Sequence, residues 1–199
     1  HLWPGNQYSM ELPQLQALAA KVPAEYKEIP SIAKLLNRIE VLAKTAVGQK
    51  FTDFTLPDPE GNPMKLSDII AKNKYTLIDF WASWHPQSVS EQDSLQSVIK
   101  ALKKEKFVIC SLSLDLNKEA WLKASDRDTT QWKQICDFNG WNHPLIKGQN
   151  IQSLPSNLLL DKRKRIIARD IRGQELIDKV KDLIKKDKEE EKKKKELKK

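Results

Sequence analysis

The sequence YTLIDF at residues 75–80 is a compact apolar run with the length of a β-strand. WASW follows at residues 81–84, and the next stretch places apolar residues at helical spacings of three and four: Leu95, Val98, Ile99 and Leu102. A second run, FVICSLSL at residues 107–114, is apolar enough for a parallel strand that is buried on both faces. We therefore expect a strand, a helix and a second strand, which together form a βαβ unit.

Two β-hairpins are predicted on either side of this unit. The first joins two short strands across the turn PDPEGNP at residues 57–63, which is rich in proline, glycine and asparagine. The second joins Leu158–Asp161 to Arg165–Ala168 across three basic residues. The first turn has the composition that favours a reversal of the chain.

Further helices are expected at Lys118–Ala124 and after Gly173, where apolar residues again recur on one face. The stretch that contains Trp132, Phe138 and Trp141 shows no clear period, and we expect an irregular segment there. Taken together, the elements predict an α/β domain with a mixed central β-sheet and helices on both faces.

The chain divides into three parts. Residues 1–46 show helical spacings interrupted by Pro23 and Pro30, and we expect a helical N-terminal arm or the remnant of an upstream domain. The α/β domain is expected over residues 47–185. Residues 186–199 are expected to form a charged tail that is either helical or disordered.

Charge and hydropathy narrow the classes of partner. The 199 residues include 35 basic and 27 acidic side chains, a formal charge of +8. Residues 185–199 hold nine lysines and five acidic residues, so this segment supplies +4 of that charge, and the remaining surface is too evenly mixed to favour nucleic acid. A membrane-spanning helix needs about 20 consecutive apolar residues, and no apolar run in the sequence approaches that length. The sequence begins at His1 without an initiator methionine, so we expect a processed or truncated product.

Five segments carry a resemblance to a known family. They are residues 47–54 (VGQKFTDF), 58–66 (DPEGNPMKL), 78–84 (IDFWASW), 111–115 (SLSLD) and 153–161 (SLPSNLLLD). Over residues 47–185 the chain resembles the TlpA-like, redoxin (AhpC/TSA-related) branch of the thioredoxin superfamily, which contains bacterial thiol-disulfide oxidoreductases. The resemblance implies a thioredoxin-like fold with an N-terminal β-hairpin. It also implies the bacterial periplasm or cell envelope, reached through a leader that this sequence does not contain.

The redox motif of this family is missing. In the family, WASW precedes Cys-x-x-Cys at the start of a helix, whereas here His85-Pro86-Gln87-Ser88 follows. The family's reaction needs a thiolate whose pKa is lowered by the helix N-terminus and a second sulfur that resolves the mixed disulfide. A serine hydroxyl stays protonated near neutral pH and forms no disulfide, so we expect no catalytic residue at His85 or Ser88. Glu91 matches the family's acidic position and is expected to be a solvated carboxylate near the helix N-terminus.

The resemblance also implies a peptide-binding groove. Pro155 matches the family's cis-proline, whose loop faces the start of the helix and presents backbone groups to an extended peptide. The expected lining residues are Trp84, His85, Pro86, Gln87, Leu154 and Pro155. The alternative is that this loop serves only the fold. The favoured function is a redox-inactive thioredoxin-fold protein that binds a peptide or protein in this groove.

The two cysteines, Cys110 and Cys136, are too few for a disulfide-dense scaffold or for a zinc site made of cysteines alone. Cys110 is expected to pack as a small apolar residue and Cys136 as a partly buried thiol. The alternative is a Cys110–Cys136 disulfide or a displaced redox pair, which would make the protein an atypical thiol oxidoreductase or antioxidant protein. A third hypothesis is that the domain is a structural module of a larger envelope protein, attached through residues 1–46.

Other chemistry finds little support in the sequence. His85 and Ser88 have the spacing of a base and a nucleophile, but no third group or oxyanion hole accompanies them. A metal site made of His85, Glu91 and His143 would require distant residues to converge. We therefore expect no metal and no cofactor, and the sequence leaves the partner and the oligomeric state open.

Overall fold

The computed structural model describes residues 10–125 and 131–197, and its centre is a five-stranded mixed β-sheet with the strand order β5-β4-β3-β6-β7. The strands are β3 (Tyr75–Trp81), β4 (Phe107–Ser113), β5 (Trp132–Cys136), β6 (Ser156–Asp161) and β7 (Ile166–Arg169). β3, β4 and β5 are parallel, whereas β6 and β7 are antiparallel to their neighbours. Helix α4 (Pro86–Ala101) joins β3 to β4. The predicted βαβ unit and the second hairpin are therefore confirmed.

Strand β5 differs from the prediction of an irregular segment. It pairs with β4 in parallel, with Ile109 opposite Trp132 and Ser113 opposite Cys136. The sequence WKQIC contains a lysine and a glutamine, so it lacks the apolar run that marked β3 and β4. The strand forms because it pairs with β4, and such tertiary context outweighs intrinsic β propensity.

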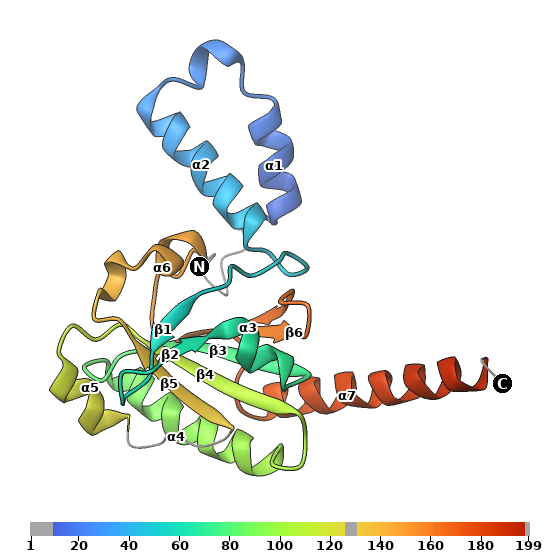
Figure 1. Cartoon of the computed structure of the whole chain (residues 1–199). Coiled ribbons are helices and arrows are strands. Elements are labelled where there is room, and N and C mark those ends of the chain that lie inside the picture. Colours follow the sequence, from blue (N-terminus) through green and yellow to red (C-terminus); the bar gives the residue numbers. More distant parts are fainter. Residues whose placement is uncertain (1–9, 126–130, 198–199) are drawn as a thin grey trace.

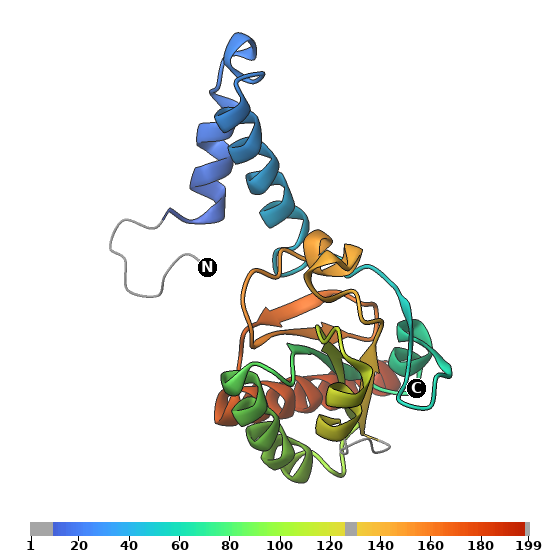
Figure 2. The same ribbon diagram turned by 90° about the vertical axis from the view of Figure 1, so that its left-hand side faces the viewer.

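Helices cover both faces of the sheet, as predicted (Figures 1 and 2). On one face, α4 and α7 (Gly173–Glu196) pack together over a buried cluster that includes Leu77, Leu95 and Leu176. The other face is covered by the β1–β2 hairpin, α3 (Leu66–Ala71) and α6 (Pro144–Gly148), as the second cluster shows. Helix α5 (Lys118–Ala124) buries Trp121 in a third cluster.

The first hairpin forms where the sequence predicts it. Strand β1 (Thr55–Pro57) pairs antiparallel with β2 (Pro63–Lys65), and Gly61 in the turn between them has a φ of 88°. A positive φ is accessible to glycine at little cost, which explains this residue in the turn.

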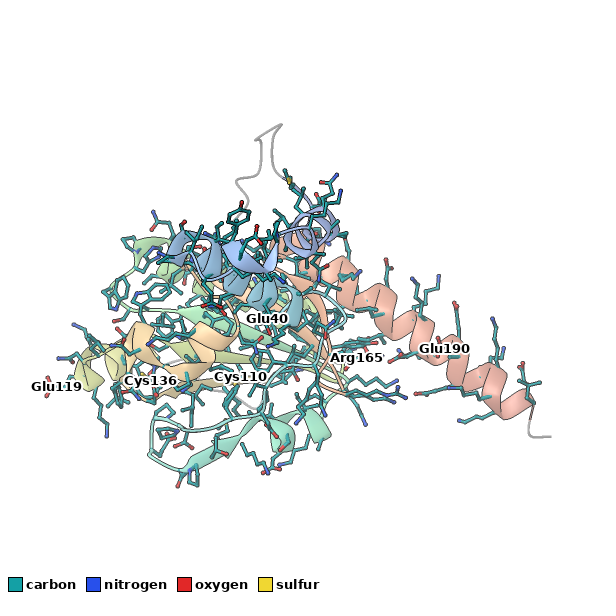
Figure 3. All side chains as sticks on the ribbon, turned by 90° about the horizontal axis from the view of Figure 1, so that it is seen from above. Glu40, Cys110, Glu119, Cys136, Arg165 and Glu190 are labelled. Atoms are coloured by element: carbon teal, nitrogen blue, oxygen red, sulfur yellow. The ribbon has the colours of Figure 1, made fainter. Side chains whose placement is uncertain are left out.

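The N-terminal arm stands away from the sheet as a helical hairpin (Figure 1). It consists of α1 (Leu12–Ala20), the 3₁₀ turn η1 (Ala24–Tyr26) and α2 (Pro30–Lys44). α1 has no buried residue and α2 has only Ile39, so the two helices pack mainly on each other. At the other end of the chain, α7 continues through the lysine-rich segment and projects beyond the sheet, where Figure 3 labels Glu190.

Candidate functional site

The turn between β3 and α4 is fixed by a buried carboxylate. The Ser83 backbone N–H donates to Asp115 Oδ2 at 3.0 Å, and the Ser83 hydroxyl donates to Asp115 Oδ1 at 2.6 Å. Ser113 at the end of β4 also donates to Asp115. These bonds hold the loop that carries Trp84 and His85 against the ends of the parallel strands.

His85 caps helix α4 with its side chain. Its Nδ1 accepts the backbone N–H of Ser88 at 3.3 Å and lies 3.2 Å from the Ser88 hydroxyl oxygen. Because Nδ1 accepts a backbone donor, this nitrogen carries no proton. Ser88 is fully buried, so its hydroxyl has no access to a substrate. The pair therefore serves as a helix cap and lacks the geometry of a base with its nucleophile.

The outer face of the same turn is open to solvent. The Trp84 indole is 54% exposed and meets the His85 ring edge to face, with 5.9 Å between ring centroids. Pro86 and Gln87 are exposed, and His85 is half-buried. An indole left in water beside a polar turn is a usual feature of binding surfaces.

The loop that contains Pro155 reaches the same edge of the sheet. Phe80 pairs with Ser156 in the β3–β6 register, so the residues after β3 and the residues before β6 leave the sheet side by side. The Leu154–Pro155 peptide bond is cis, and Pro155 is half-buried. The Leu154 side chain, in contrast to the expected groove lining, lies in the core, so only its backbone can line a groove.

Glu91 differs from the expected solvated carboxylate. Its side chain is only 13% exposed, and Oε2 lies 3.6 Å from Arg172 Nε. Burial raises the pKa of Glu91, while the Arg172 cation lowers it. Glu91 Oε1 is buried and has no hydrogen-bond partner among the described residues. The sequence spacing placed Glu91 correctly on α4 but did not show that an arginine covers it.

Arg172 is a site residue that the sequence analysis missed. It is the N-cap residue of α7, and its Nη2 donates to the Pro155 carbonyl at 2.6 Å. The same guanidinium therefore connects the loop at Pro155 to Glu91 on α4. A cation at a helix N-terminus opposes the helix dipole, and that unfavourable position was the available signal in the sequence.

A buried polar layer lies beneath α4, and the sequence analysis missed it too. Asp79 in the middle of β3 is 1% exposed, and its Oδ2 accepts hydrogen bonds from Gln92 Nε2 at 2.6 Å and from the Ser111 hydroxyl at 2.8 Å. Trp132 Nε1 donates to Ser111 at 2.9 Å. Burial raises the pKa of Asp79 to about 6, although the bonds from Ser111 and Gln92 oppose this shift. The signal was one aspartate inside an apolar strand run.

The two cysteines lie away from the turn and from each other. Cys110 is opposite Lys133 in the β4–β5 register, whereas Cys136 is opposite Ser113, three positions along, so their side chains point to opposite faces of the sheet. Figure 3 labels both, and both remain thiols. The alternative of a Cys110–Cys136 disulfide is therefore wrong for this structure.

Neither thiol has the environment of a reactive cysteine. Both are fully buried, so the expected partial exposure of Cys136 is wrong. Burial raises the pKa of Cys136 to about 11, with the Phe138 N–H and Ser113 opposing the shift. A reactive cysteine is accessible and has a lowered pKa, so this geometry argues against a displaced redox pair.

His143 is engaged far from His85 and Glu91. Its Nδ1 accepts the Leu145 N–H at 3.0 Å, and its Nε2 lies 3.3 Å from Asp137 Oδ2. Across residues 10–125 and 131–197, no group of three histidine, cysteine or acidic side chains is arranged to hold a metal ion. Within the same ranges, no helix has the length and apolar character needed to cross a bilayer.

Comparisons with known proteins agree with this architecture. Residues 47–172 match the model of the AhpC/TSA family. A thiol-disulfide oxidoreductase from Bacteroides fragilis is 38% identical with a TM-score of 0.62, and the match covers 68% of this chain and 99% of that one. The thioredoxin domain of a thiol-disulfide oxidoreductase from Bacteroides vulgatus is 29% identical with a TM-score of 0.62, covering 69% and 97%.

A longer neighbour shares the fold alone. This thioredoxin-like protein from Bacteroides caccae is 21% identical with a TM-score of 0.70, and the match covers 89% of this chain and 65% of that one. No curated protein matches the chain.

Proposed function

This chain belongs to the AhpC/TSA family and resembles its thioredoxin-like thiol-disulfide oxidoreductases, yet α4 begins without sulfur, and from this premise we propose that it binds an extended polypeptide without dithiol exchange. The binding domain in this proposal comprises residues 47–185, and the predicted arm at residues 1–46 is described from residue 10 on, residues 1–9 lying outside the described part. The compartment is the bacterial periplasm or cell envelope, as the resemblance implies. The proposed binding includes no covalent step and therefore calls for no cofactor.

One observation carries the proposal. The turn at the start of α4 exposes 54% of Trp84 while His85 and Ser88 close on each other as a cap and both thiols lie buried elsewhere. The surface therefore offers contact area and no nucleophile. An extended peptide would pack on the Trp84 indole and pair with backbone groups of the loop before Pro155, by strand addition.

The described part of the arm, residues 10–46, does not cover this surface. Trp84, Pro86 and Gln87 are exposed in a structure that includes the arm. The exposed indole stands against the half-buried His85 ring and next to the exposed Pro86 and Gln87, and this grouping at the start of α4 favours binding.

The test uses the insulin B chain with both thiols carboxymethylated, because this peptide has no thiol available for exchange. Its binding to the full chain is measured by fluorescence anisotropy for wild type, Trp84→Ala and Tyr26→Ala. Tyr26 is the matched control, since it is 48% exposed and lies in η1 on the arm.

We expect the wild type and Tyr26→Ala to bind equally and Trp84→Ala to bind at least about tenfold more weakly, since burial of a large apolar side chain contributes about 1.5–3 kcal/mol. Absence of binding by the wild type contradicts the proposal. If Trp84→Ala binds as tightly as the wild type, the turn at Trp84 is not part of the binding surface.

A further inference from the structure

A cleft of about 340 Å³ separates the arm from the segment that precedes β6. Its arm side is apolar and its domain side is polar. The lining residues are Leu12, Leu15, Leu42, Thr45, Ala46, Asn150, Gln152, Ser153, Ser156, Arg169 and Asp170. We propose that this cleft is a second subsite for the same bound polypeptide and takes one of its large apolar side chains. This inference rests on the proposed function.

The walls of the cleft are held in place by arginines. Arg169 Nη1 donates to the Thr45 carbonyl at 2.6 Å, and its Nη2 donates to the Gln149 carbonyl at 3.2 Å. Arg38 on α2 donates to the Gln152 side chain at 3.3 Å. Thr45 is the C-cap of α2, so the guanidinium also meets the negative end of the helix dipole. A cleft with fixed walls loses little entropy when a ligand binds.

The arm wall suits an aliphatic or aromatic side chain. This wall is lined by Leu12 and Leu15 of α1, by Leu42 of α2 and by Ala46, which follows α2. Leu15 and Leu42 are only half-buried, so further apolar contact area is available on both helices. The volume lies at the lower end of the range for ligand sites, about 300–1,000 Å³, which corresponds to one or two side chains rather than a large cofactor.

The polar wall decides between a peptide and a small ligand. Asp170 Oδ1 accepts hydrogen bonds from the Ser156 hydroxyl at 2.7 Å and from the Asn157 N–H at 3.1 Å, so a fixed carboxylate lines the cleft beside Arg169. A purely apolar ligand would leave this wall without partners, and an anion would meet the carboxylate. A peptide backbone supplies both donors and acceptors, so a polypeptide fits both walls.

The cleft is continuous with the loop of the proposed groove. Ser153 and Ser156, which line the cleft, flank the Leu154–Pro155 bond. Arg172 holds the Pro155 carbonyl on the other side of this loop. In this proposal a strand that lies along the loop from Trp84 places its next residues in the cleft, and Figure 2 shows the arm above the α/β domain.

The experiment uses the full chain and the fluorescein-labelled, carboxymethylated insulin B chain. Ala46→Trp fills the cleft, and Ala33→Trp makes the same change at an exposed position of α2. Leu15→Gln removes apolar wall, and Leu18→Gln makes the same change one turn further along α1, where the side chain is 48% exposed. Circular dichroism checks that each variant keeps its helices.

We expect Ala46→Trp and Leu15→Gln to weaken binding about tenfold, as the loss of one buried apolar side chain predicts, and both controls to bind like the wild type. If Ala46→Trp and Leu15→Gln bind with wild-type affinity, the cleft is not a subsite, and the proposed groove at Trp84 is unaffected by that result. Failure of the wild type to bind overturns the proposed function itself. A dimer that only Ala46→Trp dissociates, seen by sedimentation, assigns the cleft to a second copy and also overturns the inference.

Discussion

The exposed and the buried sides of helix α4 differ in the chemistry that their side chains allow. On the exposed side, the turn at Trp84 and His85 presents an indole and an imidazole but no sulfur. On the buried side, Asp79 is bonded to Gln92 of α4 and to Ser111 of β4, and burial raises its pKa to about 6. One side has a contact surface, and the other has a carboxylate that titrates near neutral pH.

A buried carboxylate with this pKa destabilises the fold when it ionises, so packing alone does not account for Asp79. Carboxylates with raised pKa values are frequent at functional sites. The exposed turn, in contrast, has no group that forms a disulfide. The helix therefore starts above a buried carboxylate, and neither position 85 nor position 88 carries sulfur.

The largest expected effect is a gain of activity in His85→Cys/Ser88→Cys. A thiol at the N-cap of α4 has a lowered pKa, and a second thiol three residues later resolves the mixed disulfide. We expect the double variant to reduce insulin disulfides with dithiothreitol at least about tenfold faster than the uncatalysed reaction, and the wild type not to accelerate it. Ser88→Cys alone is the control and should be inactive. Turnover by the wild type would contradict the account.

The next effect concerns the native sulfurs. Because Cys110 and Cys136 are fully buried, alkylation requires opening of the structure, and we expect labelling of the native chain to be at least about 10³-fold slower than that of the denatured chain. Iodoacetamide labelling at pH 8, followed by mass spectrometry, measures both rates. Fast labelling of either thiol in the native chain would revive the displaced redox pair.

Asp79→Asn tests the buried side. Asparagine keeps the shape and an acceptor for Gln92 and Ser111 but does not ionise, so the free energy of unfolding at pH 7 should rise by roughly 2–3 kcal/mol, from 1.36 kcal/mol per pKa unit. The raised pKa of Asp79 makes the wild type lose stability as pH rises from the ordinary value of 3.8 through about 6. The stability that Asp79→Asn gains over the wild type should therefore vanish near pH 4 and be constant above pH 7.

Chemical denaturation of the wild type and of Asp79→Asn across this pH range gives the difference between their free energies of unfolding. The contributions of the other titrating groups cancel in this difference. A gain that does not change with pH would mean that Asp79 does not titrate as described. A loss of stability at pH 7 would mean that its charge is favourable in the fold.

A smaller effect is the energetic coupling between Arg172 and Glu91. Arg172→Gln leaves Glu91 half-buried without its cation, whereas Glu91→Gln removes the charge that burial disfavours. We expect a coupling of about 1 kcal/mol in the double-mutant cycle at pH 7, because Arg172 is partly screened by solvent. The cycle is measured by urea unfolding of the four proteins. Additive single changes would show that the two residues act independently.

The parts of the fold with long apolar patterns were predictable from the sequence. β3, β4, α4 and α7 each have a run or a repeated spacing that only one kind of element satisfies. β5 was missed because Lys133 and Gln134 interrupt its pattern, and its strand conformation depends on pairing with β4. The His85–Ser88 replacement was readable because the strand before it fixes its position.

The contacts around the site were not predictable, because they join residues far apart in the chain. Glu91 is buried by Arg172, and Asp79 is bonded to Ser111, which belongs to another strand. The cleft beside the arm depends on Arg169, which donates to the carbonyl of Thr45. Local periodicity gives the face of an element, but it does not give the partner on that face.

The most direct measurement compares one peptide in two sulfur states. The insulin B chain is prepared with both thiols carboxymethylated and, separately, with its two cysteines joined in a disulfide, and both forms are titrated into the wild-type chain. The account predicts dissociation constants within about threefold of each other and no covalent adduct by mass spectrometry, because the contact surface at Trp84 does not use sulfur. Binding of the disulfide form alone, or a trapped mixed disulfide, would contradict it.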